Sequence, residues 1–139
     1  MTGLEAVTAV AVYIEANKAT VFGERGGKVF KYEKKNDYAG DYIAVNNLPF
    51  IHRNSTETDT VNVNVHVKDL DTGEPNTKRL TEIVKEVVDM FNFTDGVKLG
   101  QAYYRYFSDS RPTPDRDSTS YVNIQIDCIH TDEKILTEN

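Results

Sequence analysis

The residues best suited to catalysis or metal binding in this sequence are three histidines and one cysteine. His52, His66 and His130 do not pair at the spacing of metal ligands, so we expect no metal site. His66 lies on the polar face of a strand-like segment, beside Asn62 and Asn64, which is typical of an ordinary surface histidine. Cys128 has no base near it in the sequence, so we expect a buried structural thiol rather than a nucleophile. These residues therefore predict neither catalysis nor a bound cofactor.

Two short segments are similar to binding loops, but each departs from the pattern that binding requires. Residues 23–28 (GERGGK) end in Gly-Lys as a phosphate-binding loop does, yet Val29 stands where Ser or Thr must bind magnesium. Asp69, Asp71 and Gly73 resemble the opening of a calcium loop, but the glycine comes one place early and further oxygen ligands are missing. We therefore expect a flexible loop at the first segment and a turn that enters a helix at the second.

The segment 108–119 (SDSRPTPDRDST) is too polar for a core and mixes both signs of charge. Mixed charge of this kind indicates a solvated loop, or salt bridges with a partner, rather than paired catalytic carboxylates. Its charged side chains are Asp109, Arg111, Asp115, Arg116 and Asp117.

The aromatic strand before this loop, Ala102–Phe107, presents different residues on its two faces. Alternation places Tyr104 and Tyr106 on one face, which fits the core. The other face carries Tyr103, Arg105 and Phe107. Tyr, Phe and Arg are enriched in protein interfaces, so this second face is a candidate subunit contact. Stacking on nucleic-acid bases would need a basic surround, which this segment lacks.

Two alternating strands and one amphipathic helix predict the core that positions these residues. In Thr60–Lys68 every odd-numbered residue up to position 67 is valine and the others are polar, which predicts a sheet covered on one face only. Ser120–His130 alternates in a similar way. A helix is predicted after Asn76 or Thr77 as its N-cap, because apolar residues then recur at helical spacing. The apolar stripe consists of Leu80, Ile83, Val84, Val87, Val88 and Phe91, and the polar side consists of Lys78, Arg79, Glu82, Lys85, Glu86 and Asp89.

The remaining segments complete an α+β fold in the order α-β-β-β-α-β-β. A helix over Leu4–Lys18, with Leu4 in its apolar stripe, is followed by short strands at Lys28–Tyr32 and Asp41–Asn46. We expect a mixed, mainly antiparallel sheet of about five strands with both helices packed on one face. The chain then forms a single domain over residues 1–139, of which 131–139 is a flexible tail.

The composition and net charge argue for a folded domain and against several classes of function. The chain has 139 residues, 39% of them hydrophobic and 27% charged, which argues for a folded domain. A net charge of -6 argues against binding to duplex nucleic acid or to an anionic membrane. Glu5 and Glu15 interrupt the N-terminal segment, so we expect no signal peptide or membrane span, and synthesis in a cytoplasm. One cysteine cannot form an intrachain disulfide.

The order and periodicity of these segments resemble the tail-terminator proteins, also called minor tail or tail-completion proteins, of long-tailed bacteriophages. The resemblance covers the chain from Leu4 to about His130 and rests on KVFKY, GDYIAVNNLPF, TVNVNVHVKDL, NTKRLTEIVKEVVDMF, AYYRYF and YVNIQIDCIH. It implies a structural virion protein, made in the host cytoplasm, that forms a ring and commonly a hexamer. Such a ring caps the tail tube and joins it to the head connector. The family has no catalytic residues to carry over.

The resemblance also implies a set of partners and contact surfaces. The partners are further copies of the chain, the tail tube protein and the head–tail connector protein. DNA would pass through the ring without sequence-specific binding. By this analogy the loops 23–40, 47–59 and 108–119 are contact surfaces. The candidate contact residues are Arg25, Lys28, His52, Arg53, Asn62, Asn64, His66, Tyr103, Arg105, Phe107, Asp109, Arg111, Asp115, Arg116 and Asp117.

Three alternative functions stay open at this point. The chain would serve equally as another head–tail connector component or as a baseplate subunit. It would also fit a small ligand-binding or regulatory α+β module, in which the face of Tyr103 and Phe107 lines a pocket. An enzyme would need catalytic groups assembled from different subunits, and it ranks lowest.

Overall fold

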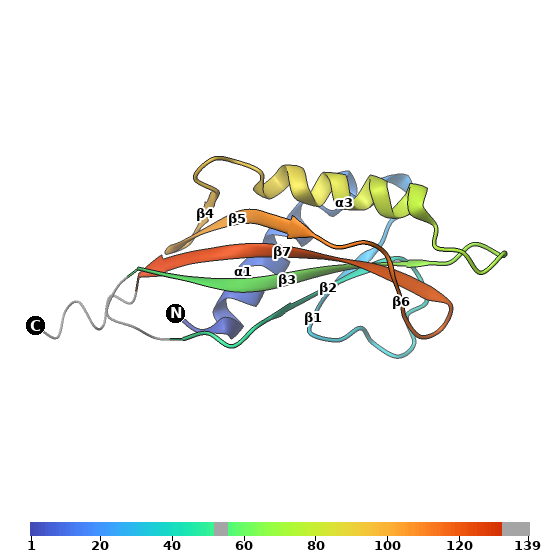
Figure 1. The fold of residues 1–139 in the computed structure, drawn as a ribbon, viewed down its shortest axis with the longest axis horizontal. Helices are drawn as coiled ribbons and strands as arrows, with labels where there is room; N and C mark the ends of the chain where they lie inside the picture. Colours follow the sequence, from blue (N-terminus) through green and yellow to red (C-terminus); the bar gives the residue numbers. More distant parts are fainter. Residues whose placement is uncertain (52–55, 132–139) are drawn as a thin grey trace, which may run out of the picture.

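The elements of the fold occur in the expected order, with additional short ones between them (Figure 1). The computed structural model describes residues 1–51 and 56–131. The helices are α1 (Gly3–Ala16), α2 (Lys18–Phe22), the 3-10 helix η1 (Gly23–Arg25) and α3 (Thr77–Phe91). The strands are β1 (Lys28–Lys31), β2 (Tyr42–Asn47), β3 (Thr56–Lys68), β4 (Val97–Leu99), β5 (Ala102–Asp109), β6 (Thr113–Pro114) and β7 (Thr119–Thr131). Of the predicted tail, only Thr131 lies among the described residues, and it ends β7.

The fold is α+β and its sheet is mixed, as the sequence predicts. Seven strands form the sheet, in the order β1-β2-β3-β7-β5-β4, and β6 pairs with β7 off this path. Only β1 and β2 run parallel among the described pairs, and the other pairs are antiparallel. The predicted count of about five strands and two helices was too low, because α2, β4 and β6 are too short to show a periodic pattern.

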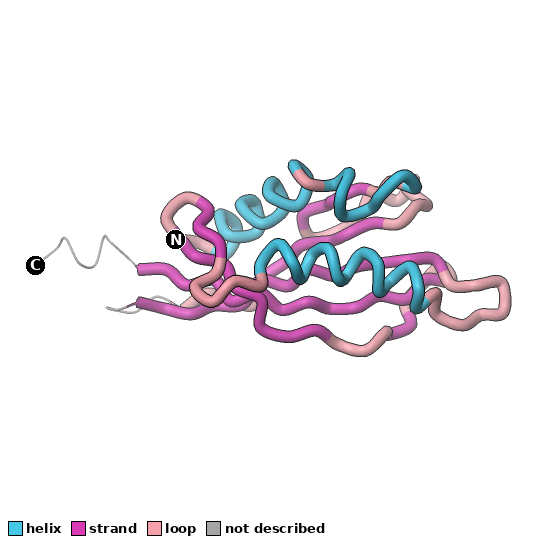
Figure 2. Tube along the Cα trace, turned by 90° about the horizontal axis from the view of Figure 1, so that it is seen from above, coloured by secondary structure: helices cyan, strands magenta, loops and turns pink. Residues whose placement is uncertain are grey.

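The core lies between one face of the sheet and the two long helices. The four valines of β3, from Val61 to Val67, are completely buried, and α1 and α3 lie over the sheet (Figure 2). Opposite them in β7, Ile124 pairs with Val63 and Ile126 pairs with Val61. Burial of one such side chain contributes about 1.5–3 kcal/mol, so this row of residues strongly specifies the register of β3 against β7. The predicted one-sided burial of these strands is confirmed.

Helix α1 ends two residues earlier than the sequence predicts. It starts with a capping box, in which the Thr2 hydroxyl accepts from the backbone N–H of Glu5 and the Glu5 carboxylate accepts from the N–H of Thr2. At the other end, Asn17 Nδ2 donates to the carbonyl of Tyr13 at 2.9 Å, and this side chain competes with the helical pattern before α2 begins.

The buried stripe of α1 differs from the predicted one at its first position. Leu4 is 67% exposed, so its assignment to the stripe was wrong. Val12 is 61% exposed on the same helix, which leaves part of the outer side of α1 apolar. The buried residues of α1 are Ala6, Val7, Val10, Ala11 and Ile14.

Helix α3 starts at the predicted N-cap, where the Asn76 side chain accepts from the backbone N–H of Arg79 at 3.1 Å. The sequence placed Arg79 on the solvent side of this helix, and that was wrong. Arg79 Nε donates to Asp41 Oδ2 at 2.8 Å, and Arg79 Nη2 donates to the carbonyl of Phe22 at 2.8 Å. The guanidinium is therefore buried between α3, the end of α2 and the residue that precedes β2.

Strand β5 is longer than predicted and contains a β-bulge. Tyr106 lies opposite Ile126 and Ser108 lies opposite Gln125, so Phe107 is the extra residue between two ladder positions. The segment 108–119, predicted as a loop, therefore begins with the last residues of β5 and includes β6. A bulge of this kind bends the strand and redirects a side chain, and Phe107 is 64% exposed.

Candidate functional site

The uncovered face of the sheet carries a ladder of asparagine side chains that bond to one another. Asn62 Nδ2 donates to Asn46 Oδ1 at 2.9 Å. Asn123 Nδ2 donates to Asn62 Oδ1 at 3.2 Å and to Asn64 Oδ1 at 2.8 Å. Asn62 and Asn64, two of the predicted contact residues, thus have partners within the sheet. These three bonds join the amides of neighbouring strands and keep this face polar.

Strand β5 carries two exposed aromatic rings and one arginine, the residues that the sequence assigned to its outer face. Tyr103 is 43% exposed and Phe107 is 64% exposed. Between them, Arg105 Nη2 lies 3.4 Å from Asp127 Oδ2 of β7. Tyr104, on the opposite face of the strand, is completely buried. This outer face is the part of the described sheet where large apolar groups stand beside the polar ladder.

The expectation that His66 is a surface residue was wrong. Its ring stacks between Tyr42, at a centroid distance of 4.3 Å, and Tyr121, at 5.1 Å, and the residue is only 9% exposed. The pKa of His66 is lowered to about 4, chiefly by burial; the Asp115 charge opposes this shift and the nearby Lys34 ammonium adds to it. His66 is therefore neutral at neutral pH, although its Nδ1 lies 3.4 Å from Asp115 Oδ2.

Two of the three predicted contact loops meet at this histidine. The β1–β2 connection and the turn that leads into β7 line a groove of about 330 Å³, which includes Lys34, Asp115, Arg116 and Asp117. Its floor is formed by the sheet residues Tyr42, Ala44 and His66. The third predicted loop is described only in part, because residues 52–55 lie outside the described residues.

The other predicted contact residues are dispersed over the surface. Arg25 Nε lies 3.5 Å from Asp41 Oδ2, and Lys28 Nζ lies 5.1 Å from the centre of the Tyr38 ring. Asp109 accepts a short hydrogen bond from the hydroxyl of Tyr106, and Arg111 is exposed. His52 and Arg53 lie outside the described residues. The predicted contact residues that the structure describes thus do not form one continuous site: one group lies at β5, another lies at His66, and the others are separate.

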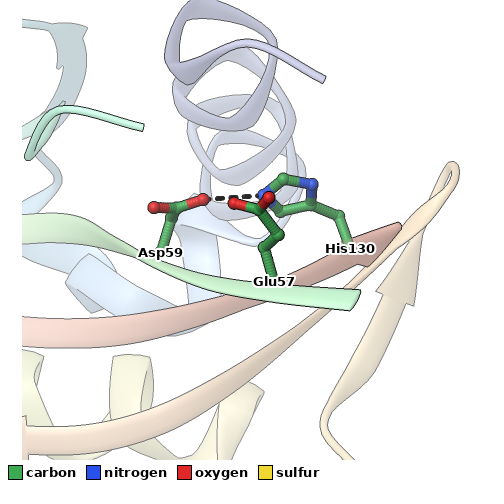
Figure 3. A group of neighbouring side chains, drawn as sticks. All are labelled: Glu57, Asp59 and His130. Carbon is green, nitrogen blue, oxygen red and sulfur yellow. Dashed lines mark hydrogen bonds and ion pairs between the residues drawn. The ribbon is translucent and has the colours of Figure 1, made fainter. Parts of the chain in front are cut away.

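A cluster that the sequence did not indicate lies at the end of the covered face, where β3 begins and β7 ends (Figure 3). Glu57, Asp59 and His130 each bring one possible metal-ligand atom to within 4.8 Å of the other two. His130 Nε2 lies 2.8 Å from Asp59 Oδ2, and the three residues are between 3% and 9% exposed. The backbone N–H of Ile51 donates to Asp59 Oδ1 at 3.4 Å. An acid–imidazole pair of this kind is able to share a proton or to bind a cation.

Two atoms of this acid–histidine cluster lack hydrogen-bond partners. Within the described part of the chain, nothing bonds to Glu57 Oε1 or to His130 Nδ1, although both atoms are buried. The His130 ring instead stacks against Phe50, with the ring centres 5.5 Å apart. Uncompensated burial of a carboxylate oxygen is costly, so this arrangement favours a bound cation or proton.

An apolar groove of about 840 Å³ adjoins the cluster. Its walls come from α1, with Glu5, Val12 and Tyr13, and from the turn between β4 and β5. His130 and Thr131 line the groove, so the imidazole side of the cluster adjoins a space that opens to solvent.

The cluster was missed because its members are distant in sequence, although one signal was present. Glu57 and Asp59 occupy the odd-numbered row that continues into Val61, so alternation places them on the covered face. His130 lies two positions after Cys128, which the sequence correctly places in the core. Pairing of Glu57 with His130 follows only once the register of the two strands is known.

Comparisons with known proteins leave the family of this chain open. No family model matches the sequence, and no curated protein matches it. Over residues 1–51 and 56–131, no helix has the length and apolar character needed to span a membrane.

Proposed function

We propose that this protein is a structural subunit that assembles with copies of itself into a ring, as expected from its resemblance to phage tail terminators. The ring would cap a tail tube and join it to a head–tail connector. The observation that carries the proposal is the outer face of β5, where Tyr103 and Phe107 are exposed beside Arg105. Aromatic residues and arginine dominate the binding energy of protein interfaces.

The rest of the uncovered face suits a subunit that is soluble before it assembles. Its asparagine side chains bond to one another, so the free chain exposes a polar surface around the aromatic pair. In a ring each contact joins two different patches, so the β5 face of one copy would meet another surface of its neighbour. The net charge of -6 is compatible with a lumen through which DNA passes without being held.

The ligand-binding alternative receives less support from the geometry. It required the face of Tyr103 and Phe107 to line a pocket, but the groove of about 840 Å³ is lined by α1 and the β4–β5 turn instead. A connector or baseplate role would use the same β5 contact, so those alternatives differ from a terminator in the partner and not in the surface.

The assembly proposal is tested by measuring particle mass with light scattering and by negative-stain microscopy. We expect ring particles of the wild-type chain, and a loss of assembly affinity of at least about tenfold for Phe107→Ser and for Tyr103→Ser. The matched control is Phe93→Ser, because Phe93 is 56% exposed between α3 and β4 and lies outside the proposed contact.

The choice between a terminator and a connector follows from mixing the rings with isolated tail tubes or with connectors. A chain that stays monomeric at high concentration and binds neither structure would contradict the proposal. Rings that form equally well from Phe107→Ser and Phe93→Ser would show that the β5 face is not the contact.

A further inference from the structure

We propose that Glu57, Asp59 and His130 form a binding site for a divalent transition-metal ion, and that Zn²⁺ fits this ligand set best. The three residues lie on the helix-covered face of the sheet, whereas the proposed ring contact lies on the outer face of β5. The metal site is therefore independent of the assembly proposal, and either one can fail alone.

The positions of the three ligands require only a small adjustment around one ion. Zn²⁺ binds carboxylate oxygen and imidazole nitrogen at roughly 2.0–2.2 Å, so its ligand atoms lie roughly 3–3.5 Å from one another. Asp59 Oδ2 and His130 Nε2 are 2.8 Å apart, and all three ligand atoms lie within 4.8 Å. Glu57 has a flexible side chain, and rotation about its bonds is sufficient to close the remaining distance.

A second observation points to a ligand in the same place. Glu57 is 5% exposed, and among the described residues its Oε1 has no hydrogen-bond partner. Figure 3 shows its carboxylate directed toward the space beside Asp59 and the imidazole ring of His130. None of the described lysines or arginines forms an ion pair with either carboxylate. Two buried carboxylates side by side need a positive charge, and a divalent cation supplies it.

The donor atoms favour a transition metal over magnesium or calcium. Mg²⁺ and Ca²⁺ take oxygen ligands, whereas imidazole nitrogen suits zinc and its neighbours. Cys128, which pairs with Asp59 across the two strands, is not part of the proposed ligand set.

The surroundings also set an upper bound on the affinity. Metal-binding histidines generally donate their second ring N–H to an acceptor, but His130 Nδ1 has no such acceptor among the described residues. We therefore expect weaker binding than in zinc sites that have this support. The groove lined by His130 gives an ion a path to the site. Binding would tie the start of β3 to the end of β7.

The experiment uses the full chain freed of metal by chelation, with calorimetry and thermal unfolding. We expect one Zn²⁺ per chain, at least tenfold weaker binding of Mg²⁺, and a melting temperature about 5–10 °C higher at a hundredfold excess over Kd. Glu57→Gln, Asp59→Asn and His130→Gln should each weaken Zn²⁺ binding at least tenfold. The matched control is His66→Gln, because His66 also lies near a carboxylate, that of Asp115, but the described residues offer it no third ligand.

A measurement on the unmodified chain tests the site without depending on the folding of any variant. Paramagnetic Mn²⁺ should broaden the NMR signals of the His130 ring and leave those of His66 unchanged. The proposal is wrong if Zn²⁺ does not bind at one ion per chain, or if binding survives both Glu57→Gln and His130→Gln. It is also wrong if Glu57→Gln raises the melting temperature while added Zn²⁺ has no effect on the wild-type chain.

Discussion

The buried ion pair between Arg79 and Asp41 should contribute strongly to the free energy of unfolding. Their side chains are 9% and 2% exposed, and Nε and Oδ2 are 2.8 Å apart. Removing one member of a buried pair costs about 3–5 kcal/mol, because the other charge stays buried without compensation. Arg25 Nε lies 3.5 Å from the same oxygen, and it would partly replace the lost charge. We therefore expect Arg79→Met to lower the free energy of unfolding by about 3 kcal/mol, the low end of that range.

Removing the other charge of the pair, with Asp41→Asn, should lower the free energy of unfolding by less. In Asp41→Asn the guanidinium keeps the carbonyl of Phe22 at 2.8 Å and that of Gly26 at 3.4 Å, so we expect a loss of about 2 kcal/mol. The double variant removes both charges together, and its loss should fall short of the sum of the two single losses by about 1.5–2 kcal/mol.

Urea unfolding followed by circular dichroism measures all four proteins, at one protein concentration because assembly adds to apparent stability. The matched control is Lys18→Met, which removes the exposed pair of Lys18 with Glu15 at 3.0 Å. That pair should contribute at most about 0.5 kcal/mol. Losses that add within about 0.5 kcal/mol, or an Arg79→Met loss no larger than that of Lys18→Met, would refute the reasoning.

Two further predictions concern pH and backbone conformation. The pKa of His66 falls from 6.5 in the unfolded chain to about 4 in the fold, so the unfolded state binds more protons between these values. Stability should therefore decrease by up to about 3 kcal/mol as the pH falls from 6.5 to 4, and His66→Phe should flatten this part of a pH series of urea midpoints. An unchanged slope would contradict the burial of a neutral His66. Gly96 and Gly73 both have positive φ, but a Cβ on Gly96 would lie 2.7 Å from the Tyr104 carbonyl oxygen, whereas Gly73 faces open space. Gly96→Ala should thus cost about 1–3 kcal/mol more than Gly73→Ala in thermal unfolding, and equal losses would contradict the close approach.

Local periodicity was sufficient to predict the elements that build the core. The valines of β3 repeat every two residues, and the apolar residues of α3 repeat at helical spacing. Each pattern could therefore be recognised within its own segment. The exposure of Tyr103 beside the buried Tyr104 followed from the same alternation. The bulge at Phe107 could not be predicted, since it depends on the pairing of β5 with β7.

Two polar residues that are buried by distant partners were wrongly predicted to face solvent. Arg79 follows the polar side of its helix by spacing, yet its partner Asp41 lies 38 positions away. His66 belongs to the polar row of β3, but Tyr42 and Tyr121 on the neighbouring strands enclose it. In both cases the partner is set by tertiary packing, which a single segment does not encode.

Buried carboxylates lie at both ends of the covered face, and their charge is compensated differently at each end. At the end near β2, the carboxylate of Asp41 is balanced by Arg79 from the chain itself. At the other end the valine row continues into Asp59 and Glu57, where His130 is the only described side chain that can carry a positive charge beside them. Two buried carboxylates beside one imidazole favour an external cation at this end. If Zn²⁺ is that cation, chelation should destabilise the chain at the β3–β7 end while leaving the coupling between Asp41 and Arg79 unchanged.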